Sequence, residues 1–411
     1  MSKRYAEYVD SGVPWLGDVP AGWTTRPLWS MFERIKDVGH PDEQMLSVFR
    51  DYGVVAKDSR SNINKTAENR NIYQLVHPGW LVTNRMKAWQ GSVGISGLRG
   101  IVSGHYICFA PRHDADSRYL NWLFRSPTYA AGYALQSRGV RIGQAEIDND
   151  LYRVMPVLLP PIEEQRAIAE YLDRETAGID TLVEEQQRLI EMLHERREAT
   201  IRRALLSGLE AADTVPSGVE SLGDIPKYWR MVPTRYLCTI TTGSEDSGNA
   251  TDDGDYPFYV RGRQVLRIDH YSFDDEAVMT PGDGQGGTGK VFHYFNGKFE
   301  AHQRVYVFKD FVGISGRYFY YFLSTFLRPV ALAGSNTVTM ESLRRPLLAN
   351  FKVALPPLDE QRRITAYLDE RTSKIDALIA ETEQFIELAR ERRTALITAA
   401  VTGQVDGREV A

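Results

Sequence analysis

A long internal repeat constrains this 411-residue chain more than any other feature of its sequence. Residues 159–201 and 355–397 align without a gap at an offset of 196 and share 22 identities in 43 positions. A shorter echo, SGVPWLGDVPAGW at 11–23 and SGVESLGDIPKYW at 217–229, recurs at an offset of 206. Because a repeat of this kind indicates duplicated structural units, the chain is organised twice over as a head, a variable segment and a repeated segment.

Both repeated segments have the pattern of long helices. Each opens with Leu-Pro-Pro and then carboxylates, which favour the positive end of a helix. An apolar spacing of three and four residues follows, which predicts a coiled-coil seam. That seam consists of Ile168, Leu172, Ile179, Leu182, Leu189 and Leu193 in the first copy, and of Ile364, Leu368, Ile375, Leu378, Phe385 and Ala389 in the second. Helices about 65 Å long cannot bury such a stripe alone, so we expect the copies to pack as an antiparallel coiled coil; two unrelated surface helices are the alternative.

The variable segments share a pattern rather than a sequence. Aromatic and β-branched runs broken by glycine predict short strands, joined to helical pieces at 117–126 and 316–327. Trp23 and Trp229 end the two heads, and we expect them to anchor each variable segment to the helices by packing. The expected fold class is α+β, with two α/β domains separated by two long helices in a pseudo-twofold repeat. We predict a first domain over 1–158, a central helix over 159–208, a second domain over 209–354, and a C-terminal helix and tail over 355–411.

Composition and charge narrow the class of protein. Cys108 and Cys238 lie in apolar, strand-like stretches and are expected to be buried thiols in a reducing compartment. The first ten residues lack the apolar core of a signal peptide, and no window approaches the ~20 apolar residues that span a bilayer, so we expect a cytoplasmic protein. The net charge is −5, yet residues 1–158 carry 19 basic against 15 acidic residues. This asymmetry permits DNA binding without demonstrating it.

A glycine-rich run at 281–290 satisfies two nucleotide-binding patterns by letter. Gly282, Gly284 and Gly287 match G-x-G-x-x-G, and Gly284 to Lys290 match a phosphate loop up to its lysine. Both motifs need a helix directly after the glycines, whereas the strand-like run VFHYF follows Lys290. We therefore favour a loop that approaches a ligand closely, DNA included. The sequence shows no other catalytic, metal or cofactor motif, so neither an enzyme nor a bound cofactor is expected.

The duplicated LPP..EQR.I..YLD..T..ID.L segments, each preceded by a variable region that opens SGV..LGD.P..W, resemble the specificity subunit of type I restriction–modification systems. The resemblance covers essentially the whole chain. It implies a non-catalytic DNA-reading subunit with two target-recognition domains, which recruits methyltransferase and translocase/endonuclease partners. S-adenosylmethionine, ATP and magnesium would then be bound by those partners.

The duplication itself supports the same design. Near-identical helices predict two equivalent docking surfaces, so two copies of a methyltransferase subunit should bind, together with restriction/translocase subunits. Divergent domains predict that each end reads a different sequence, which gives a bipartite, asymmetric target in double-stranded DNA. Half-sites on the order of one helical turn apart, ~34 Å, would lie on one face of the duplex. Glu184, Glu185, Glu381 and Glu383 are candidate docking charges, although charge on a long helix is more often mere solvation.

The candidate DNA-reading residues are those whose side chains present paired donors and acceptors to base edges, chiefly Arg, Lys, Asn and Gln in loops. They are Arg85, Lys87, Gln90, Ser92 and Arg99 in the first domain, and Arg261, Arg263, Gln264, Gln285, Thr288, Lys290, Gln303, Arg304 and Asn336 in the second. For each residue a solvated or structural role is the alternative. Some contacts would go to phosphate and carry no sequence information.

Three other functions remain open at this point. The same module could serve a different restriction–methylation assembly with a separate recognition chain. A duplicated coiled-coil scaffold could join two proteins without touching DNA, and an NTP-binding enzyme could be built on Gly284 to Lys290. If the chain captures a methyltransferase in a pull-down, it belongs to a restriction–methylation assembly and is not a scaffold for unrelated proteins. A nucleotide-binding titration tests the NTP-binding enzyme.

Overall fold

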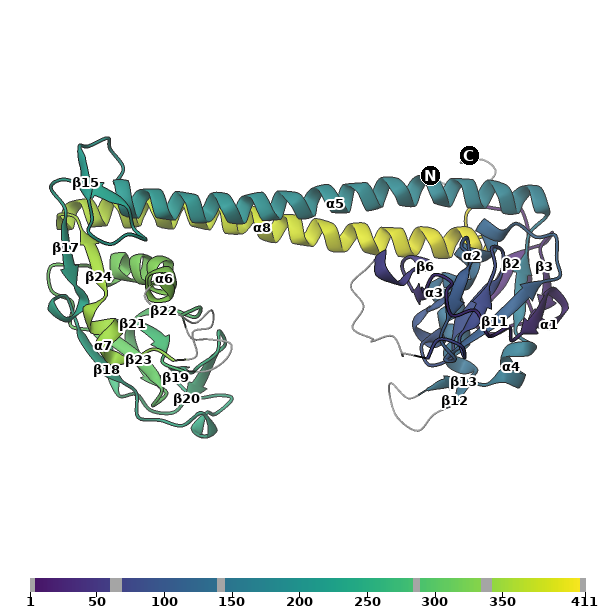
Figure 1. The fold of residues 1–411 in the computed structure, drawn as a ribbon, viewed down its shortest axis with the longest axis horizontal. Coiled ribbons are helices and arrows are strands. Elements are labelled where there is room, and N and C mark those ends of the chain that lie inside the picture. The colour runs from purple at the N-terminus through teal and green to yellow at the C-terminus, as the bar shows by residue number, and fades with distance from the viewer. Residues whose placement is uncertain (1–3, 60–68, 139–144, 284–288, 334–341, 407–411) are drawn as a thin grey trace. The chain divides into compact units, whose positions relative to one another are not determined.

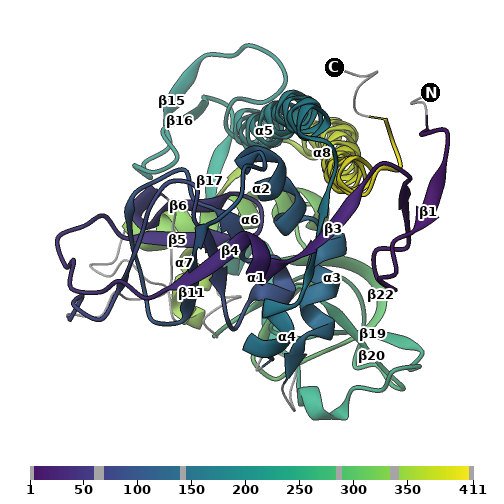
Figure 2. The same cartoon turned by 90° about the vertical axis from the view of Figure 1, so that its right-hand side faces the viewer.

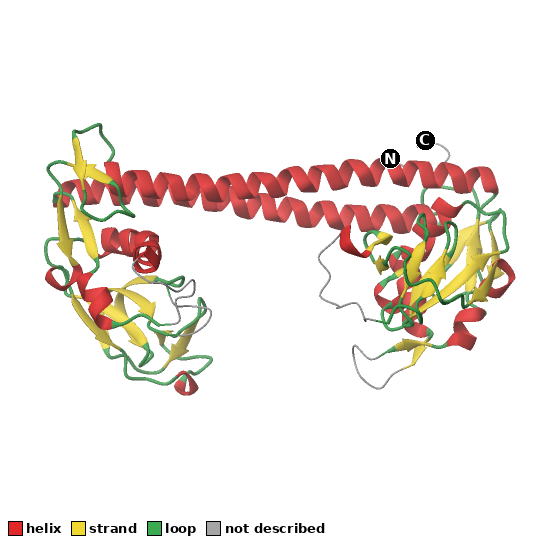
Figure 3. Ribbon diagram, in the orientation of Figure 1, coloured by secondary structure: helices red, strands yellow, loops and turns green. Residues whose placement is uncertain are grey.

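The computed structural model describes residues 4–59, 69–138, 145–283, 289–333 and 342–406, without the side chains of 331–333. The chain divides into two compact units, Met1–Gln187 with Gln384–Ala411, and Arg188–Glu383. Each unit therefore combines one variable segment with part of both long helices. The fold is α+β, with two sheet-rich domains and two long helices (Figure 3), as the sequence predicts. The bounds of the four predicted segments stay a prediction.

The two repeated segments form the long helices α5 (Ile162–Ser207) and α8 (Leu358–Val401), which lie side by side in both views (Figures 1 and 2). In the first unit the Arg393 Nε lies 2.8 Å from the Asp180 Oδ1, and in the second unit the Arg197 Nε lies 2.8 Å from the Asp376 Oδ1. These pairs occupy equivalent positions of the repeat and join the early part of one helix to the late part of the other. The predicted antiparallel pairing is confirmed.

The seam between the helices differs from the predicted one at two positions of each helix. Leu182, Leu189, Leu378 and Phe385 were expected inside it but are 37%, 37%, 50% and 43% exposed, so this part of the prediction is wrong. The residue after each of them takes the seam position. Ile379 and Ile386 are buried, and their counterparts Val183 and Ile190 are half-buried.

Threonines explain the error. The prediction considered only apolar residues, whereas the seam also contains polar ones. Thr176, Thr372 and Thr382 are buried in it. Each hydroxyl donates to the backbone carbonyl four residues earlier, over 2.6 Å, 2.7 Å and 2.7 Å respectively. Such a bond satisfies a buried hydroxyl within its own helix. The true spacing therefore runs from Ile375 to Ile379, four residues on, rather than to Leu378.

The first variable segment folds onto a four-stranded antiparallel sheet with the strand order β4-β11-β8-β9. Helices α2 and α3 cover it, and Leu81, Leu120, Phe124 and Tyr129 belong to the resulting core. The helices are α1 (Leu28–Met31), α2 (Ser117–Arg125), α3 (Pro127–Leu135) and α4 (Asn149–Arg153). The strands are β1 (Tyr8–Asp10), β2 (Asp18–Pro20), β3 (Thr24–Pro27), β4 (Phe32–Ile35), β5 (Leu46–Phe49), β6 (Gly53–Ala56), β7 (Gln74–Val76), β8 (Leu81–Asn84), β9 (Val93–Ile95), β10 (Gly100–Val102), β11 (Tyr106–Pro111), β12 (Ser137–Arg138), β13 (Glu146–Ile147) and β14 (Pro156–Leu159).

The second variable segment has a larger sheet of six strands in the order β18-β23-β21-β22-β19-β20, antiparallel except where β19 meets β22. Helix α6 packs on it through Phe319 and Phe322, against Val278 and Phe308 of the sheet. The helices are α6 (Gly316–Ala333) and α7 (Arg345–Asn350). The strands are β15 (Thr214–Pro216), β16 (Asp224–Pro226), β17 (Arg230–Pro233), β18 (Thr239–Thr242), β19 (Tyr256–Tyr259), β20 (Val265–Ile268), β21 (Phe273–Pro281), β22 (His293–Ala301), β23 (Val305–Lys309) and β24 (Lys352–Leu355).

Each head is anchored to a helix by the acidic residue of the LPP..EQR motif. The Trp23 indole N–H donates to the Glu164 carboxylate over 3.1 Å, and the Trp229 N–H donates to Glu360 over 3.2 Å. Both tryptophans and both glutamates are buried. A buried hydrogen bond to a charged acceptor stabilises by roughly 1.5–3 kcal/mol. The predicted anchoring role of the two tryptophans is confirmed.

The glutamine of the same motif holds the variable segment. The Gln165 amide donates to the Pro160 carbonyl over 2.8 Å and accepts the Asp116 backbone N–H over 2.9 Å, just before α2. Gln361 accepts the Ser315 N–H over 2.9 Å, just before α6, in the equivalent way. The motif is therefore a structural joint, made once in each unit.

The two cysteines and the hydropathy of the described helices agree with what the sequence predicts. Cys108 and Cys238 are buried and free, and burial raises the pKa of each thiol to about 12. Such thiols are unreactive at neutral pH. In the part of the chain that the structure describes, no helix is both long and apolar enough to cross a membrane.

Candidate nucleic-acid interface

The first variable segment gathers four of its five candidate residues in one loop, between β8 and β9. Arg85, Lys87, Gln90 and Ser92 all lie there. The loop is tied down by its own backbone, since the Ser92 N–H donates to the Lys87 carbonyl and the Asn84 N–H to the Ser92 carbonyl. Lys87 and Gln90 are exposed, whereas Ser92 is buried. The surface that this loop offers to a ligand therefore comes from the longer side chains.

Two arginines of this segment are already paired with carboxylates. Arg85 forms an ion pair with Glu146 of β13. Arg99 lies in the turn between β9 and β10, where its guanidinium contacts Glu43 at 2.8 Å and the His77 Nδ1 at 3.2 Å. Arg99 thus belongs to a different loop from the other four candidates.

The second variable segment presents its described candidates on two turns of the six-stranded sheet. Arg261, Arg263 and Gln264 are exposed in the turn between β19 and β20. Gln303 and Arg304 are exposed in the turn between β22 and β23. Gln285, Thr288 and Asn336 lie outside the described residues.

A carboxylate joins these two turns. The Asp283 Oδ2 accepts a hydrogen bond from the Arg304 Nη1 over 2.8 Å, and its Oδ1 lies 3.8 Å from the Arg261 Nη1. A second carboxylate, Asp246, accepts a bond of 3.4 Å from the Gln303 amide. Neither aspartate was among the candidates from the sequence, because carboxylates are less common base readers than Arg or Gln. The only available signal was the position of Asp283 inside the glycine-rich run.

The turn that carries Gln303 and Arg304 is held rigidly at its base. His302 is buried, and its Nδ1 accepts the Arg304 backbone N–H over 3.0 Å. The His302 N–H donates to the Tyr259 carbonyl over 2.9 Å, and the Gln303 N–H donates to the Glu245 carbonyl over 2.9 Å. Burial, and then the charge of nearby Arg261, lower the pKa of His302, which keeps Nδ1 free to accept.

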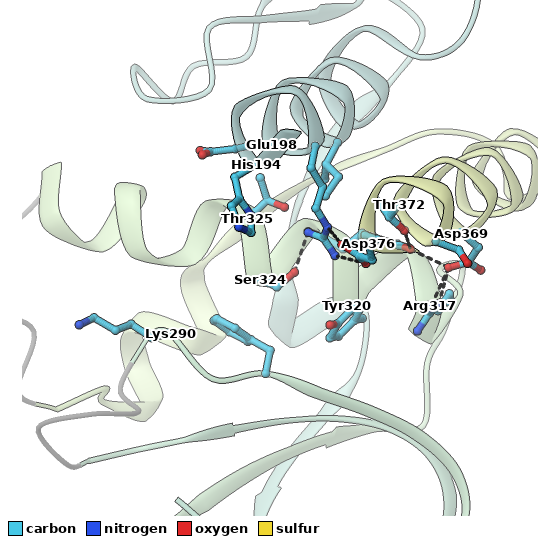
Figure 4. Close-up of a pocket in the computed structure, with 15 residues that line it drawn as sticks. His194, Glu198, Lys290, Arg317, Tyr320, Ser324, Thr325, Asp369, Thr372 and Asp376 are labelled. Carbon is cyan, nitrogen blue, oxygen red and sulfur yellow. Dashed lines mark hydrogen bonds and ion pairs between the residues drawn. The ribbon is translucent and has the colours of Figure 1, made fainter. Parts of the chain in front are cut away.

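Lys290 lines an open cleft of about 730 Å³ between the sheet, α6 and the helix parts of the second unit (Figure 4). The cations of the opposite wall are neutralised. Arg317 of α6 donates to Asp369 of α8 over 3.0 Å, and Arg197 pairs with Asp376. Lys290 extends away from both aspartates in Figure 4. Lys290 therefore contributes a positive charge to the sheet side of the cleft.

The glycine-rich run lacks the surroundings of a phosphate loop. Strand β21 precedes it, and the element after Lys290 is strand β22, which begins at His293. Among the described residues on either side of 284–288, no helix N-terminus is therefore available to bind a phosphate. This finding argues against a nucleotide site, while residues 284–288 of the run lie outside the described residues.

Each unit also exposes an equivalent set of three apolar side chains on its long helices. The first unit exposes Leu182, Phe385 and Leu388, and the second unit exposes Leu378, Leu189 and Met192. The two sets correspond pairwise at the repeat offset of 196. Each of the six precedes a seam residue by one position, so a step of about 100° per residue puts them on the same flank of their helices.

Comparisons with known proteins give one consistent family. Residues 226–388 match the model of the family described as "Type I restriction modification DNA specificity domain". The specificity subunit of the type I restriction enzyme EcoDI from Escherichia coli is 30% identical over 185 residues, which are 45% of this chain and 40% of that subunit. The MjaVIII specificity subunit from Methanocaldococcus jannaschii is 22% identical over 77% of this chain and 78% of its own length. The chain thus matches less than half of the E. coli relative.

Solved structures show the same fold at low identity. A chain from a study of complex assembly and conformational transition of the type I R-M system matches with a TM-score of 0.65 and 19% identity, over 93% of this chain and 98% of that one. The HsdS subunit from Thermoanaerobacter tengcongensis matches with a TM-score of 0.52 and 16% identity, over 94% of this chain and 98% of that subunit.

Proposed function

Because the chain belongs to the family of type I restriction–modification specificity subunits, we propose that it reads a bipartite, asymmetric sequence in double-stranded DNA, with one half-site for each variable segment. As a specificity subunit it is a non-catalytic part of its enzyme. One observation carries the proposal: the same joint of head tryptophan, glutamate and glutamine is built twice, and it holds two sheets of different topology. A common frame with unlike surfaces suits one enzyme that reads two unlike sequences.

The reading residues that we propose are the exposed members of the predicted set, together with the half-buried Arg85. In the first recognition domain they are Arg85, Lys87, Gln90 and Arg99, and in the second they are Arg261, Arg263, Gln264, Lys290, Gln303 and Arg304. Gln285, Thr288 and Asn336 stay candidates from the sequence alone. Ser92 is left out because its side chain is buried. Side chains of this kind, projecting from turns of a rigid sheet, can reach base edges or phosphates.

We further propose that two copies of a methyltransferase subunit dock on the exposed apolar sets, one on each unit. Apolar side chains left exposed on a long helix favour packing of a further helix. Because the sets are equivalent by the repeat, one partner surface can fit both. The charges Glu184, Glu185, Glu381 and Glu383 are exposed nearby in the sequence and would form the polar rim. Restriction/translocase subunits would join through that assembly, which would also supply the cofactors.

Adenine methylome sequencing tests the DNA-reading proposal. The chain is co-expressed with the methyltransferase subunit encoded beside it in a host without other adenine methylation. We expect one modified motif in two unlike parts separated by a gap of fixed length. A single continuous motif, or methylation without sequence preference, would contradict bipartite reading.

The stoichiometry of the complex tests the docking proposal. Replacing Leu189 and Leu378 by serine should remove one methyltransferase copy, and replacing Leu182 and Phe385 should remove the other. Native mass spectrometry should then give one copy per chain for each double variant and none for the combined one. Glu184→Ala serves as a control from the polar rim and should retain both copies. Two copies retained by the combined variant would refute this docking surface.

Helix length tests whether the paired helices set the gap of the motif. Insertion of seven residues in α5 after Gln186, matched by seven in α8 after Thr382, preserves the period of the seam. Methylome sequencing should show both half-sites unchanged and a longer gap. An unchanged gap would show that the helices do not set the spacing.

A further inference from the structure

We propose that Arg304 reads a guanine in the second half-site and that Asp283 is its positioning residue. This inference rests on the proposed DNA-reading function and identifies the residues that would give it sequence preference. It combines three observations about the second unit: a rigid turn, a carboxylate shared by two arginines, and one edge of a guanidinium that remains available.

The turn fixes the direction in which Arg304 leaves the sheet. Its backbone N–H is bonded to His302 Nδ1, and the Val305 N–H closes the turn on the His302 carbonyl over 2.8 Å. The Arg304 carbonyl accepts the Gly282 N–H over 2.8 Å, next to Asp283. Asp283 and Arg304 are therefore tied together through both backbone and side chain. An arginine on such a base loses little conformational entropy when it meets a directional acceptor.

The bond to Asp283 selects which edge of the guanidinium faces outward. Arg304 uses Nη1 toward the Asp283 Oδ2 at 2.8 Å, and its side chain is 56% exposed. Within the described part of the chain no second acceptor bonds to this guanidinium. The Nε and Nη2 edge thus keeps two parallel N–H donors. Two such donors match the O6 and N7 acceptors of guanine in the major groove.

Charge favours a base over a phosphate as the partner of Arg304. A free guanidinium binds phosphate through its net charge, but the Asp283 carboxylate at 2.8 Å offsets part of that charge. Arg304 can still donate directional hydrogen bonds to a base, while its attraction for the DNA phosphates weakens. Arg261 lies near the other oxygen of Asp283, at 3.8 Å, so the carboxylate is shared between the two turns. Arg263, for which the described residues offer no carboxylate partner, suits a phosphate contact and provides a matched control.

The experiment uses the complex of the full chain with its methyltransferase subunit. Binding is measured by competition among duplexes in which one base pair of the second half-site is varied at a time, at several salt concentrations. Arg304→Ala should lower the preference for guanine at one position by about 5- to 150-fold, with the first half-site unaffected. Arg304→Lys should not restore it, because an ammonium cannot bond both acceptors in one plane. Arg263→Ala should reduce the salt slope by about one without changing any base preference.

Asp283→Asn distinguishes a positioning role from a merely structural one. It keeps the size of the side chain but releases the charge of Arg304 and Arg261. Affinity for unrelated duplexes should therefore rise and the salt slope should steepen, while the preference for the same guanine falls. Adding Asp283→Asn to Arg304→Ala should cause no further loss of that preference.

Three outcomes would overturn the inference. They are an unchanged guanine preference in Arg304→Ala, an unchanged preference in Asp283→Asn, or an equal loss of affinity for every duplex in Asp283→Asn. Retention of the methyltransferase by each variant shows that it has folded. If the wild-type complex itself shows no sequence preference, the proposed function fails. If the wild type is specific and the variants match it, this inference alone fails.

Discussion

Neighbouring residues of α8 provide a sharp test of how the helix seam is built. Ile379 is 8% exposed and packs with Leu193, Ile375 and Ile190, whereas Leu378 is 50% exposed. Replacing Ile379 by alanine removes buried methyl groups and leaves a gap, which costs about 2–4 kcal/mol of unfolding free energy. Replacing Leu378 by alanine removes mostly exposed surface, and we expect a change within about 0.5 kcal/mol.

Thermal and urea unfolding, followed by circular dichroism at 222 nm, measure this difference. At about 2–4 °C per kcal/mol for a unit of this size, Ile379→Ala should lower Tm by roughly 4–16 °C and Leu378→Ala by no more than about 2 °C. Leu378 should matter only for retention of the methyltransferase. An equal or larger loss of stability in Leu378→Ala would refute the described seam and restore the one predicted from the apolar spacing.

Four further substitutions test the joint of the second unit, the helical Gly178 and the buried His302. Gly208→Ala should lower the unfolding free energy by about 1–3 kcal/mol, because Gly208 has φ +71° and an added Cβ would lie 2.9 Å from a Glu360 oxygen. Gly178→Ala should instead raise it by up to about 1 kcal/mol in thermal unfolding, because an added Cβ at Gly178 of α5 meets nothing within 4 Å. Trp229→Phe should lower the unfolding free energy by about 1–3 kcal/mol, because the buried carboxylate of Glu360 loses its indole donor. Burial lowers the pKa of His302, so the folded state binds fewer protons than the unfolded state between pH 5 and 7. Stability that is present above the ordinary pKa near 6.5 should therefore be lost as the pH falls below it. Urea unfolding measured from pH 5 to 7 should show a smaller change of unfolding free energy with pH for His302→Asn than for the wild type.

Much of the frame follows from the sequence because its contacts are repeated. The LPP..EQR motif occurs twice, each time after a head that ends in a tryptophan, and both copies make the same hydrogen bonds. The antiparallel pairing follows from two amphipathic helices that have a whole domain between them. The seam was missed at Leu182 and Leu378 because an apolar count cannot show that threonines satisfy their hydroxyls within the helix.

The candidate site follows from the sequence only in part. Arginine and glutamine in loops are visible as candidates, but their grouping depends on which strands become neighbours. Asp283, Arg261 and Arg304 belong to three separate turns. These turns meet because β21 pairs with β23, with Pro281 opposite Val305, and β19 pairs with β22, with Tyr259 opposite Ala301. The parallel β19–β22 pair within an otherwise antiparallel sheet has no local signal. Ser92 has a polar side chain in a candidate loop, yet the loop folds it inward.

Exchange of one recognition domain tests the central claim most directly. The segment between Pro233 and Lys352 is replaced by the equivalent segment of a relative with a known target, and β17, β24 and both long helices are kept. Co-purification with the methyltransferase confirms that the chimera has assembled, and methylome sequencing then gives its motif. We predict that one half-site changes to that of the donor, while the other half-site and the gap are retained. A motif that changes in both halves, or in neither, would contradict a chain that reads DNA through two independent domains on a duplicated frame.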